Sequence, residues 1–238
     1  MKKAKNNPAI SVIMPVYNSE KYILQAVDSI LKQSFSDFEF FIVDDASNDN
    51  TLKTLDTIND SRIIIINNDK QKGHYKCRNQ ALPMVKGKYV AVMDGDDIAH
   101  TDRFMKQFDF LENNRQFMAT GSCIELFSDQ DKEIKPFKRL TNKDQINVFL
   151  LKDNVCTHPT LFIRSEIFNK HNIRYSEEYY FSADYDLVSE INKIGSITNM
   201  PDFLLMYRNH PNQISSYGNK DQVRYADYIR LKQLSVFN

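Results

Sequence analysis

The sequence KYVAVMDGDD places three carboxylates directly after an apolar run. The run Tyr89–Met93 is β-branched and aromatic, which is typical of a strand buried on both faces of a sheet. Asp94, Asp96 and Asp97 follow it, and Gly95 lets the chain turn sharply, so that the acids on either side approach one point. Carboxylates this close repel one another unless they share a proton or a cation. A hard divalent cation would bind their oxygens and keep positions open for phosphate.

A second interpretation of these acids stays open at this point. They would lie in a polar loop and cap the next helix, which is a common role for short acidic motifs. For a single D-x-D pattern this second interpretation is favoured. The surrounding elements therefore have to decide between metal binding and helix capping.

Apolar periodicity predicts alternating strands and helices in the first half of the chain. This order is typical of an α/β fold with a parallel, doubly wound, Rossmann-like sheet and helices on both faces. In such sheets ligands bind outside the carboxyl ends of the strands. The expected strands are Ile10–Met14 (stopped by Pro15), Phe38–Val43, Arg62–Ile66 and Tyr89–Met93, and the expected helices are Glu20–Lys32 (capped by Asn18 or Ser19), Ser47 or Asn48 to Ile58, and Tyr75–Met84.

The loops at the predicted carboxyl ends carry residues that suit a nucleotide. Tyr17 would stack on a base, Asp45 would accept a hydrogen bond from a base N–H, and Lys72 or Arg78 would face phosphate. A metal at Asp96 would bridge the diphosphate. Each residue also has a plainer role, such as an acid near a helix N-terminus or a solvated loop charge. Their occurrence at four successive strand ends favours a shared site.

Bulk composition narrows the class of protein. The 238 residues hold 31 Lys plus Arg and 31 Asp plus Glu, so nothing indicates a nucleic-acid partner. The three cysteines are far apart, which predicts reduced thiols in a cytosolic protein. No apolar run approaches the roughly 18 residues of a membrane span, and the basic start lacks the apolar core of a signal peptide. We expect a cytoplasmic protein and leave peripheral attachment to the inner face of a membrane open.

The sequence of the second half predicts further helices and strands, and no low-complexity linker separates it from the first half. We therefore expect one continuous domain over residues 1–238, with a nucleotide-binding half to about residue 97 and a second half from 98 onward. The expected elements are a helix Asp102–Glu112 after Thr101, a strand Phe117–Phe127, a mobile charged excursion Asp129–Lys135, a helix from Thr141, a strand Leu161–Arg164 with a short helix near Ile167, a helix after Asp186, a strand Phe203–Tyr207, and a helix Asn219–Leu234 that contacts the domain, another chain or a membrane.

Four segments resemble family 2 glycosyltransferases with the GT-A fold: SVIMPVYN, FIVDDAS, CRNQAL and KGKYVAVMDGDD. They occur in the family's order and spacing. The resemblance implies inverting transfer of a sugar from a nucleotide diphosphate donor, most often a UDP sugar, with Mg²⁺ or Mn²⁺. The acceptor would be a hydroxyl of a glycan or lipid-linked molecule in polysaccharide or glycolipid synthesis, and a homo-oligomer stays open.

The resemblance also implies roles for individual residues. Pro15, Tyr17 and Asp45 would hold the base, Arg78 matches the family's arginine on the third helix, and Asp94 and Asp96 match its D-x-D motif. In MYRNHPNQIS, Arg208 would offset the diphosphate charge and His210 would bind the metal or the diphosphate. The direct reading and the resemblance together give an expected nucleotide-binding set of Pro15, Tyr17, Asn18, Asp45, Lys72, Arg78 and Asp94, a metal set of Asp96 and His210, and the further site residues Asp97, His158, Asp186 and Arg208. The resemblance also makes residues 1–97 a nucleotide-sugar half and residues 98–238 an acceptor half.

An inverting transfer needs a base within hydrogen-bond reach of the acceptor hydroxyl. FSADYDLVSEI offers Asp184 and Asp186, and both are also plausible helix caps. The segment resembles the family's E-D-x-x-L pattern, which implies Asp184 as base, with Ala183 where an acid usually stands. That departure leaves open how the base is oriented. We expect His158 beside the acceptor cleft.

Two rival functions remain at this stage. VAVMDGDDI resembles the hhhhDxDx[VT] strand of haloacid dehalogenase phosphatases, although that family places the motif after its first strand. A non-catalytic module that only binds nucleotide sugars is the other. The absence of GxxxxGK[ST] and of GxGxxG after the first strand argues against P-loop and dinucleotide-binding proteins.

Overall fold

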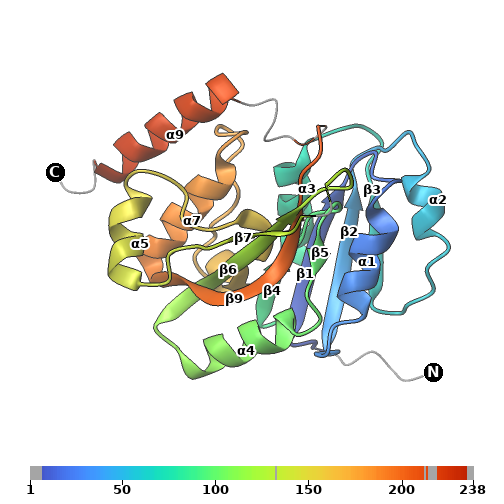
Figure 1. Ribbon diagram of the computed structural model, residues 1–238, viewed down its shortest axis with the longest axis horizontal. Coiled ribbons are helices and arrows are strands. Elements are labelled where there is room, and N and C mark those ends of the chain that lie inside the picture. Colours follow the sequence, from blue (N-terminus) through green and yellow to red (C-terminus); the bar gives the residue numbers. More distant parts are fainter. Residues whose placement is uncertain (1–6, 132, 212, 214–218, 235–238) are drawn as a thin grey trace.

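The computed structural model describes residues 7–131, 133–211, 213 and 219–234. These residues form a nine-stranded sheet in the order β3-β2-β1-β4-β8-β6-β9-β5, with β7 paired to β6. Helices cover both faces of the sheet (Figure 1). The mostly parallel α/β architecture that the sequence predicts is confirmed.

The first half of the chain builds the parallel part of the sheet. β1 lies between β2 and β4, and β2 pairs with β3, all in parallel. The carboxyl ends of these strands therefore meet at one edge. The elements are β1 Ile10–Val16, α1 Ile23–Leu31, β2 Phe38–Asp44, α2 Thr51–Leu55, β3 Ile63–Asn67, α3 His74–Ala81, η1 Leu82–Met84 and β4 Tyr89–Val92.

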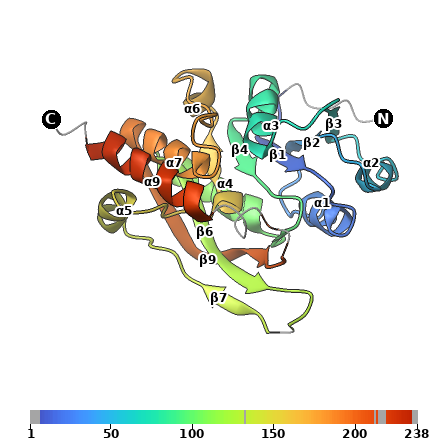
Figure 2. The same ribbon diagram turned by 90° about the horizontal axis from the view of Figure 1, so that it is seen from above.

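The second half extends the sheet with mixed strand directions. β8 runs antiparallel to β4 and to β6, whereas β6 and β9 are parallel. Because β8 pairs with β4, the sheet continues without a break from the first half into the second. Seen from above, the β6–β7 hairpin projects away from the helices (Figure 2). The elements are β5 Ile98–Ala99, α4 Arg103–Asn113, β6 Phe117–Phe127, β7 Lys135–Phe137, α5 Lys143–Leu150, η2 His158–Thr160, β8 Phe162–Arg164, α6 Glu166–Asn169, α7 Ala183–Ile194, β9 Ser196–Arg208 and α9 Asn219–Leu234.

Strand β1 is apolar throughout because both of its faces are buried. Val12 and Met14 pack under α1 and α4, and Ile13 points to the opposite face, under α3 and α7. This alternation follows from the two-residue period of a strand. The sheet thus has a core on each face, and its loops are left to carry the polar residues.

Several local expectations were wrong. Pro15 lies inside β1 and does not stop it, because β4 pairs with β1 only as far as Ile13 and the missing N–H of Pro15 interrupts no ladder there. Neither Asn18 nor Ser19 caps α1, whose N-cap is Tyr22. Asn142, rather than Thr141, caps α5 by accepting hydrogen bonds from two backbone N–H groups.

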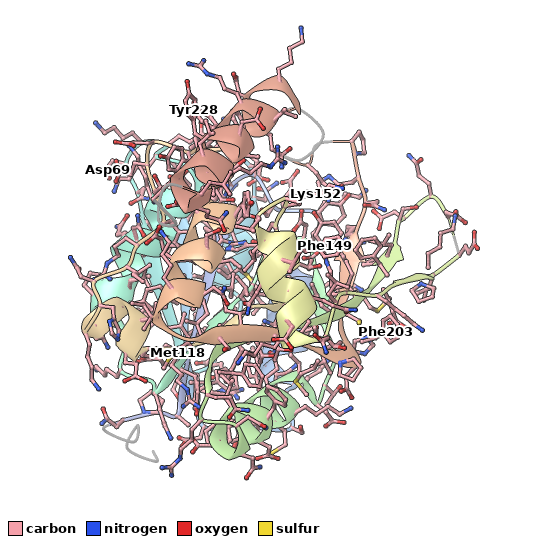
Figure 3. The ribbon with its side chains drawn as sticks, turned by 90° about the vertical axis from the view of Figure 1, so that its left-hand side faces the viewer. Asp69, Met118, Phe149, Lys152, Phe203 and Tyr228 are labelled. Carbon is pink, nitrogen blue, oxygen red and sulfur yellow. The ribbon has the colours of Figure 1, made fainter. Side chains whose placement is uncertain are left out.

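The apolar residues of α5 and α9 do not all face the core. Ile229 of α9 is fully buried, but Val223, Tyr228 and Leu234 are about half exposed, as is Phe149 of α5. Phe149, Lys152 and Tyr228 lie on the face turned to the viewer in Figure 3. Contact of this face with a membrane or a second chain stays a prediction. Among the helices of the described residues, none combines the length and apolar character of a membrane span.

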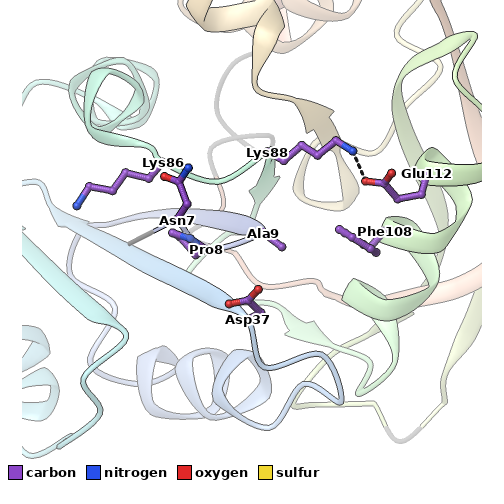
Figure 4. Close-up of a pocket in the computed structure, with 8 residues that line it drawn as sticks. All are labelled: Asn7, Pro8, Ala9, Asp37, Lys86, Lys88, Phe108 and Glu112. Atoms are coloured by element: carbon purple, nitrogen blue, oxygen red, sulfur yellow. Dashed lines mark hydrogen bonds and ion pairs between the residues drawn. The ribbon is translucent and has the colours of Figure 1, made fainter. Parts of the chain in front are cut away.

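A hollow of about 630 Å³ lies at the amino ends of β1 and β4, where Lys88 and Glu112 form an ion pair (Figure 4). Asn7, Pro8 and Asp37 also line it. It is therefore at the opposite end of these strands from the predicted site. The three cysteines are buried and free, in agreement with the expected reduced thiols.

Candidate active site

A cleft of about 1300 Å³ opens at the carboxyl ends of β1, β2 and β4 and continues between them and the second half of the chain. It brings together most of the predicted site residues. Those that line it are Pro15, Tyr17, Asn18, Asp45, Asp94, Asp96, His158, Asp184 and His210. The described site residues outside its lining are Lys72, Arg78, Asp97, Asp186 and Arg208.

The loops after β1 and β2 are tied together at the cleft rim. Asn18 has a positive φ of 46°, which asparagine tolerates better than most residues. Its backbone N–H donates to Ser47 Oγ (2.9 Å), and its Oδ1 accepts from the N–H of Asn48 (2.9 Å). Tyr17 next to it is 41% exposed, so its ring is available to stack on a base.

Asp45 is almost fully buried, and its carboxylate holds the loop before α3. Oδ1 accepts from the N–H of Lys72 (2.8 Å) and from Asn68 Nδ2 (3.3 Å), and Oδ2 accepts from the N–H of Gly73 (2.7 Å). A carboxylate oxygen accepts about two hydrogen bonds. The Cys77 thiol also interacts with this carboxylate, and Asp45 lines the cleft.

Arg78 lies beneath the acidic cluster and does not face the cleft. Its side chain is 1% exposed and forms an ion pair with Asp94 Oδ1. Burial raises the pKa of Asp94, as do the negative charges of Asp96 and Asp184, whereas Arg78 lowers it. Arg78 thus offsets the charge of Asp94 from below and is not placed to meet a phosphate directly. The ammonium of Lys72 likewise contacts Asn68 and Gln80, outside the cleft lining.

Asp96 and His210 meet across the cleft. His210 Nε2 lies 2.9 Å from Asp96 Oδ2, and both side chains are partly exposed to the cleft. Carboxylate oxygen and imidazole nitrogen both suit a divalent cation such as Mn²⁺. Within the described residues no group of three or more acidic, histidine or cysteine side chains holds a metal by itself. The pair therefore fits a metal whose other ligands are diphosphate oxygens and water.

Arg208 is buried next to this pair and contacts Asp96, Asp97 and Asp129. Its Nε donates to the carbonyl oxygen of Asp96 (2.8 Å), its backbone N–H donates to Asp97 Oδ1 (2.9 Å), and its guanidinium pairs with Asp129. Burial raises the pKa of Asp97 well above its ordinary range, and the charge of Asp96 adds to this. Arg208 and Asp97 thus support the loop that carries Asp96 and do not themselves line the cleft.

Asp184 lies in the first turn of α7 with both carboxylate oxygens engaged. The Tyr75 hydroxyl donates to Oδ1 (3.1 Å), and Asn154 Nδ2 donates to Oδ2 (2.9 Å). Burial raises the pKa of Asp184, and these hydrogen bonds to its ionised form lower it. The N-cap of α7 is Ser182, so Asp184 lies inside the first turn of the helix and is not its N-cap.

Asp186 points away from the cleft. Its Oδ1 lies 2.8 Å from Lys232 Nζ, which joins α7 to α9. Asp186 is nearly buried, and burial raises its pKa although Lys232 lowers it. It therefore has a structural role in this conformation and is not placed to serve as an alternative base.

His158 lies in the cleft within a cluster of aromatic rings. Its Nε2 is 2.9 Å from the Tyr175 hydroxyl, and Tyr75 stacks on Tyr175 with ring centroids 5.2 Å apart. Burial, with the charge of Arg78, holds the pKa of His158 well below 6.5, so the imidazole is neutral at pH 7. Packing in this cluster holds the Tyr75 ring in the orientation in which its hydroxyl reaches Asp184.

Sequence reasoning missed Tyr75 and Asn154 as partners of Asp184. Tyr75 opens an expected helix, and Asn154 follows a predicted helix by a few residues, so neither stands in a motif with Asp184. Their sequence separations from Asp184 are 109 and 30 residues. Ala183, which stands where an acid is usual, was the available signal that other residues orient the base.

Comparisons with known proteins show which family the chain resembles. Residues 11–171 match the model of Glycosyl transferase family 2. An uncharacterized glycosyltransferase of Haemophilus influenzae is 32% identical over 243 residues, which cover 98% of this chain and 75% of the relative. An Escherichia coli protein, UDP-Glc:alpha-D-GlcNAc-diphosphoundecaprenol beta-1,3-glucosyltransferase WfgD, is 31% identical over 224 residues, which cover 92% of this chain and 85% of the relative.

Solved structures share the fold. The crystal structure of S. aureus TarS 1–349 in complex with UDP-GlcNAc superposes with a TM-score of 0.76 at 22% identity, covering 92% of this chain and 65% of that chain. The mannosyltransferase PcManGT from Pyrobaculum calidifontis, in complex with GDP-Man and Mn²⁺, has a TM-score of 0.65 at 18% identity, covering 86% of this chain and 58% of that chain.

Proposed function

The chain belongs to glycosyltransferase family 2, and we propose that it is an inverting, metal-dependent enzyme that moves a sugar from a UDP sugar to a hydroxyl group. It has the GT-A fold, and family membership makes it a transferase that uses a nucleotide donor. The donor base, the metal and the stereochemical course are the proposed parts. Family membership does not favour a phosphatase or a non-catalytic module.

One observation carries the proposal. Asp96 and His210 meet at one part of a continuous cleft, and a carboxylate with a raised pKa, Asp184, lines the same cleft. A transferase of this kind needs both a site for the leaving diphosphate and a base for the acceptor. Asp96 comes from the first half of the chain, whereas His210 and Asp184 come from the second half, and one cleft contains all three. The division near residue 97 stays a prediction, since His210 of the second half lies at the proposed diphosphate site.

The donor base would lie between Tyr17 and Asp45. The exposed ring of Tyr17 offers a stacking surface, and the carboxylate of Asp45, which lines the cleft, offers an acceptor for a base N–H. Uracil has such an N–H. The Escherichia coli relative WfgD is named for UDP-glucose, and the TarS structure contains UDP-GlcNAc, which favours UDP as the nucleotide.

The diphosphate would be held through a divalent cation at Asp96 and His210. When bound, Mg²⁺ or Mn²⁺ supplies positive charge that stabilises the leaving diphosphate. Asp94 lines the cleft beside this pair, paired with Arg78 from below. Arg208 and Asp97 keep the Asp96 backbone in place from behind.

Asp184 would accept the proton of the acceptor hydroxyl. As the hydroxyl oxygen bonds to the anomeric carbon, the bond from that carbon to the diphosphate breaks, and UDP leaves with the electron pair. The hydroxyl proton moves to Asp184. Tyr75 and Asn154 orient the carboxylate, while its raised pKa makes it a better base than an exposed aspartate.

The acceptor would be a glycan, free or linked to a lipid. The name of the relative WfgD specifies a sugar on diphosphoundecaprenol. In this chain His158 and Asn154 line the cleft on the side of Asp184, where the acceptor sugar has to lie. A lipid-linked acceptor would also give the exposed apolar face of α5 and α9 a membrane to contact.

A screen of purified protein against a panel of nucleotide sugars tests this function. We expect Mn²⁺- or Mg²⁺-dependent release of UDP from one or few UDP sugars, even without acceptor, because water replaces the hydroxyl slowly. NMR of the transfer product should show an inverted anomeric centre. Equal release from GDP, dTDP and UDP sugars would contradict the UDP assignment, and release unaffected by chelation would contradict the metal.

A further inference from the structure

Arg139 follows β7 and presents its guanidinium to the cleft. Its Nε donates to Thr157 Oγ1 (2.8 Å), and the guanidinium carbon lies 4.9 Å from the centroid of the Phe137 ring. These contacts fix the plane of the side chain. Among the described residues nothing accepts a hydrogen bond from its two terminal nitrogens, so the open end of the guanidinium is available for a ligand.

The charge of Arg139 is not compensated by an ion pair within the described part of the chain. Lys21, the other lysine or arginine that lines the cleft, pairs with Asp129 at 2.7 Å. Arg139 is only partly exposed, and burial lowers its pKa. A cation that is partly withdrawn from water and forms no ion pair is unfavourable, and an anionic ligand would relieve this cost.

The position of Arg139 indicates which ligand would bring the anion. The carboxylates that act on Arg139 electrostatically are Asp153 and Asp184, which lie on the acceptor side. Thr157, which holds it, adjoins His158 in the acceptor half of the lining. The donor diphosphate belongs instead at Asp96 and His210. The anion at Arg139 would therefore belong to the acceptor.

We infer that Arg139 binds a phosphate of the acceptor, so that the enzyme selects acceptor sugars linked to a phosphate or diphosphate over neutral glycans. The open end of a guanidinium donates two parallel hydrogen bonds and matches phosphate geometry. The phosphate is recognised and not changed in the reaction. This inference rests on the proposed transfer function, for which it names the class of acceptor.

Calorimetry with decyl diphosphate on protein saturated with UDP and Mn²⁺ tests the inference, because UDP then blocks the donor site. We expect the wild type to bind decyl diphosphate and Arg139→Gln to bind it about 10- to 100-fold more weakly, the loss typical of a hydrogen-bonded charge pair. Arg139→Lys keeps the positive charge but lacks the two parallel N–H donors of the guanidinium, so its affinity for decyl diphosphate should lie between those of the wild type and Arg139→Gln. Decyl glucoside has no phosphate, so its affinity should not differ between the wild type, Arg139→Gln and Arg139→Lys.

Lys138→Gln is the matched control, because it removes one positive charge at the neighbouring position. Lys138 is exposed and does not line the cleft. It should bind decyl diphosphate like the wild type. Thermal unfolding of each variant checks that it is folded. Equal binding by wild type and Arg139→Gln, loss of binding in Lys138→Gln, or no binding to the UDP-saturated wild type would overturn the inference.

Failure of the proposed function gives a different result. A wild type that does not bind UDP, or releases none from any UDP sugar, contradicts the donor assignment. The dependence of decyl diphosphate binding on Arg139 is then still measurable in the protein without UDP.

Discussion

His210 Nε2 lies 2.9 Å from Asp96 Oδ2, although 114 residues separate the two in sequence. Asp96 follows β4 in the parallel half of the sheet, and His210 follows β9 in the second half of the chain. The contact joins two distant segments of the chain at the point where the diphosphate is proposed to bind. Because Arg208 on β9 also holds the backbone of Asp96, the two residues have a fixed relative position.

Asp184→Asn should leave UDP affinity unchanged and lower sugar transfer by roughly 10²–10⁴, the usual effect of a lost general base. Initial-rate kinetics and UDP calorimetry on the same preparation measure both quantities. Asp186→Asn is the matched control, because it makes the same change two residues along, on a side chain that faces Lys232. Near-normal turnover of Asp184→Asn would show that another residue is the base.

Tyr75→Phe should move the acid limb of the pH–rate profile upward by about one pH unit. The Tyr75 hydroxyl donates to the ionised form of Asp184 and lowers its pKa, so its removal raises that pKa. The base is active only when ionised, and activity is therefore lost at a higher pH as the solution is acidified. The ring that stacks on Tyr175 is retained.

Tyr180→Phe provides the comparison for this profile, since Tyr180 also lines the cleft but makes no hydrogen bond to Asp184. Its acid limb should coincide with that of the wild type. An unchanged or downward-shifted limb in Tyr75→Phe would disprove the role of the Tyr75 hydroxyl.

Asp45→Ala should weaken UDP binding about 10- to 100-fold and leave the affinity for pyrophosphate nearly unchanged. The variant removes an acceptor for the base and releases the backbone N–H groups of Lys72 and Gly73. Parallel titrations with UDP and with pyrophosphate, both with Mn²⁺, separate the two effects. A similar loss for both ligands would place Asp45 outside the base pocket.

Lys232→Gln should lower the free energy of unfolding by about 1 kcal/mol, because Lys232 pairs with the nearly buried Asp186 but is itself partly exposed. Urea unfolding measures this change. The double variant with Asp186→Asn should recover much of the loss, since the uncompensated buried charge is then absent. A Lys232→Gln protein as stable as the wild type would mean that the pair does not anchor α9 to α7.

The parallel half of the sheet and its site residues were accessible from sequence because apolar runs and strand-end motifs are local signals. Tyr17, Asp45 and Asp96 follow these strands and line the predicted cleft. The direction in which a side chain points, toward the cleft or toward the core, could not be predicted from the sequence. Arg78 was expected at the phosphate and instead lies beneath Asp94, because its position on α3 turns it toward the sheet.

Contacts between distant segments account for the remaining differences. The hydrogen bonds of Asp184 to Tyr75 and Asn154, and the pairing of Asp186 with Lys232, depend on how α3, α7 and α9 pack. In the segment Met206–Ser215, which the resemblance places at the diphosphate, Asn212, Ile214 and Ser215 lie outside the described residues.

Calorimetry of UDP binding with and without Mn²⁺ tests the central claim most directly, namely that a divalent cation at Asp96 and His210 holds the donor diphosphate. We predict that Mn²⁺ strengthens UDP binding by the wild type and that Asp96→Ala and His210→Ala each remove this gain. The same UDP affinity in the wild type with Mn²⁺ and with a chelator would contradict the claim.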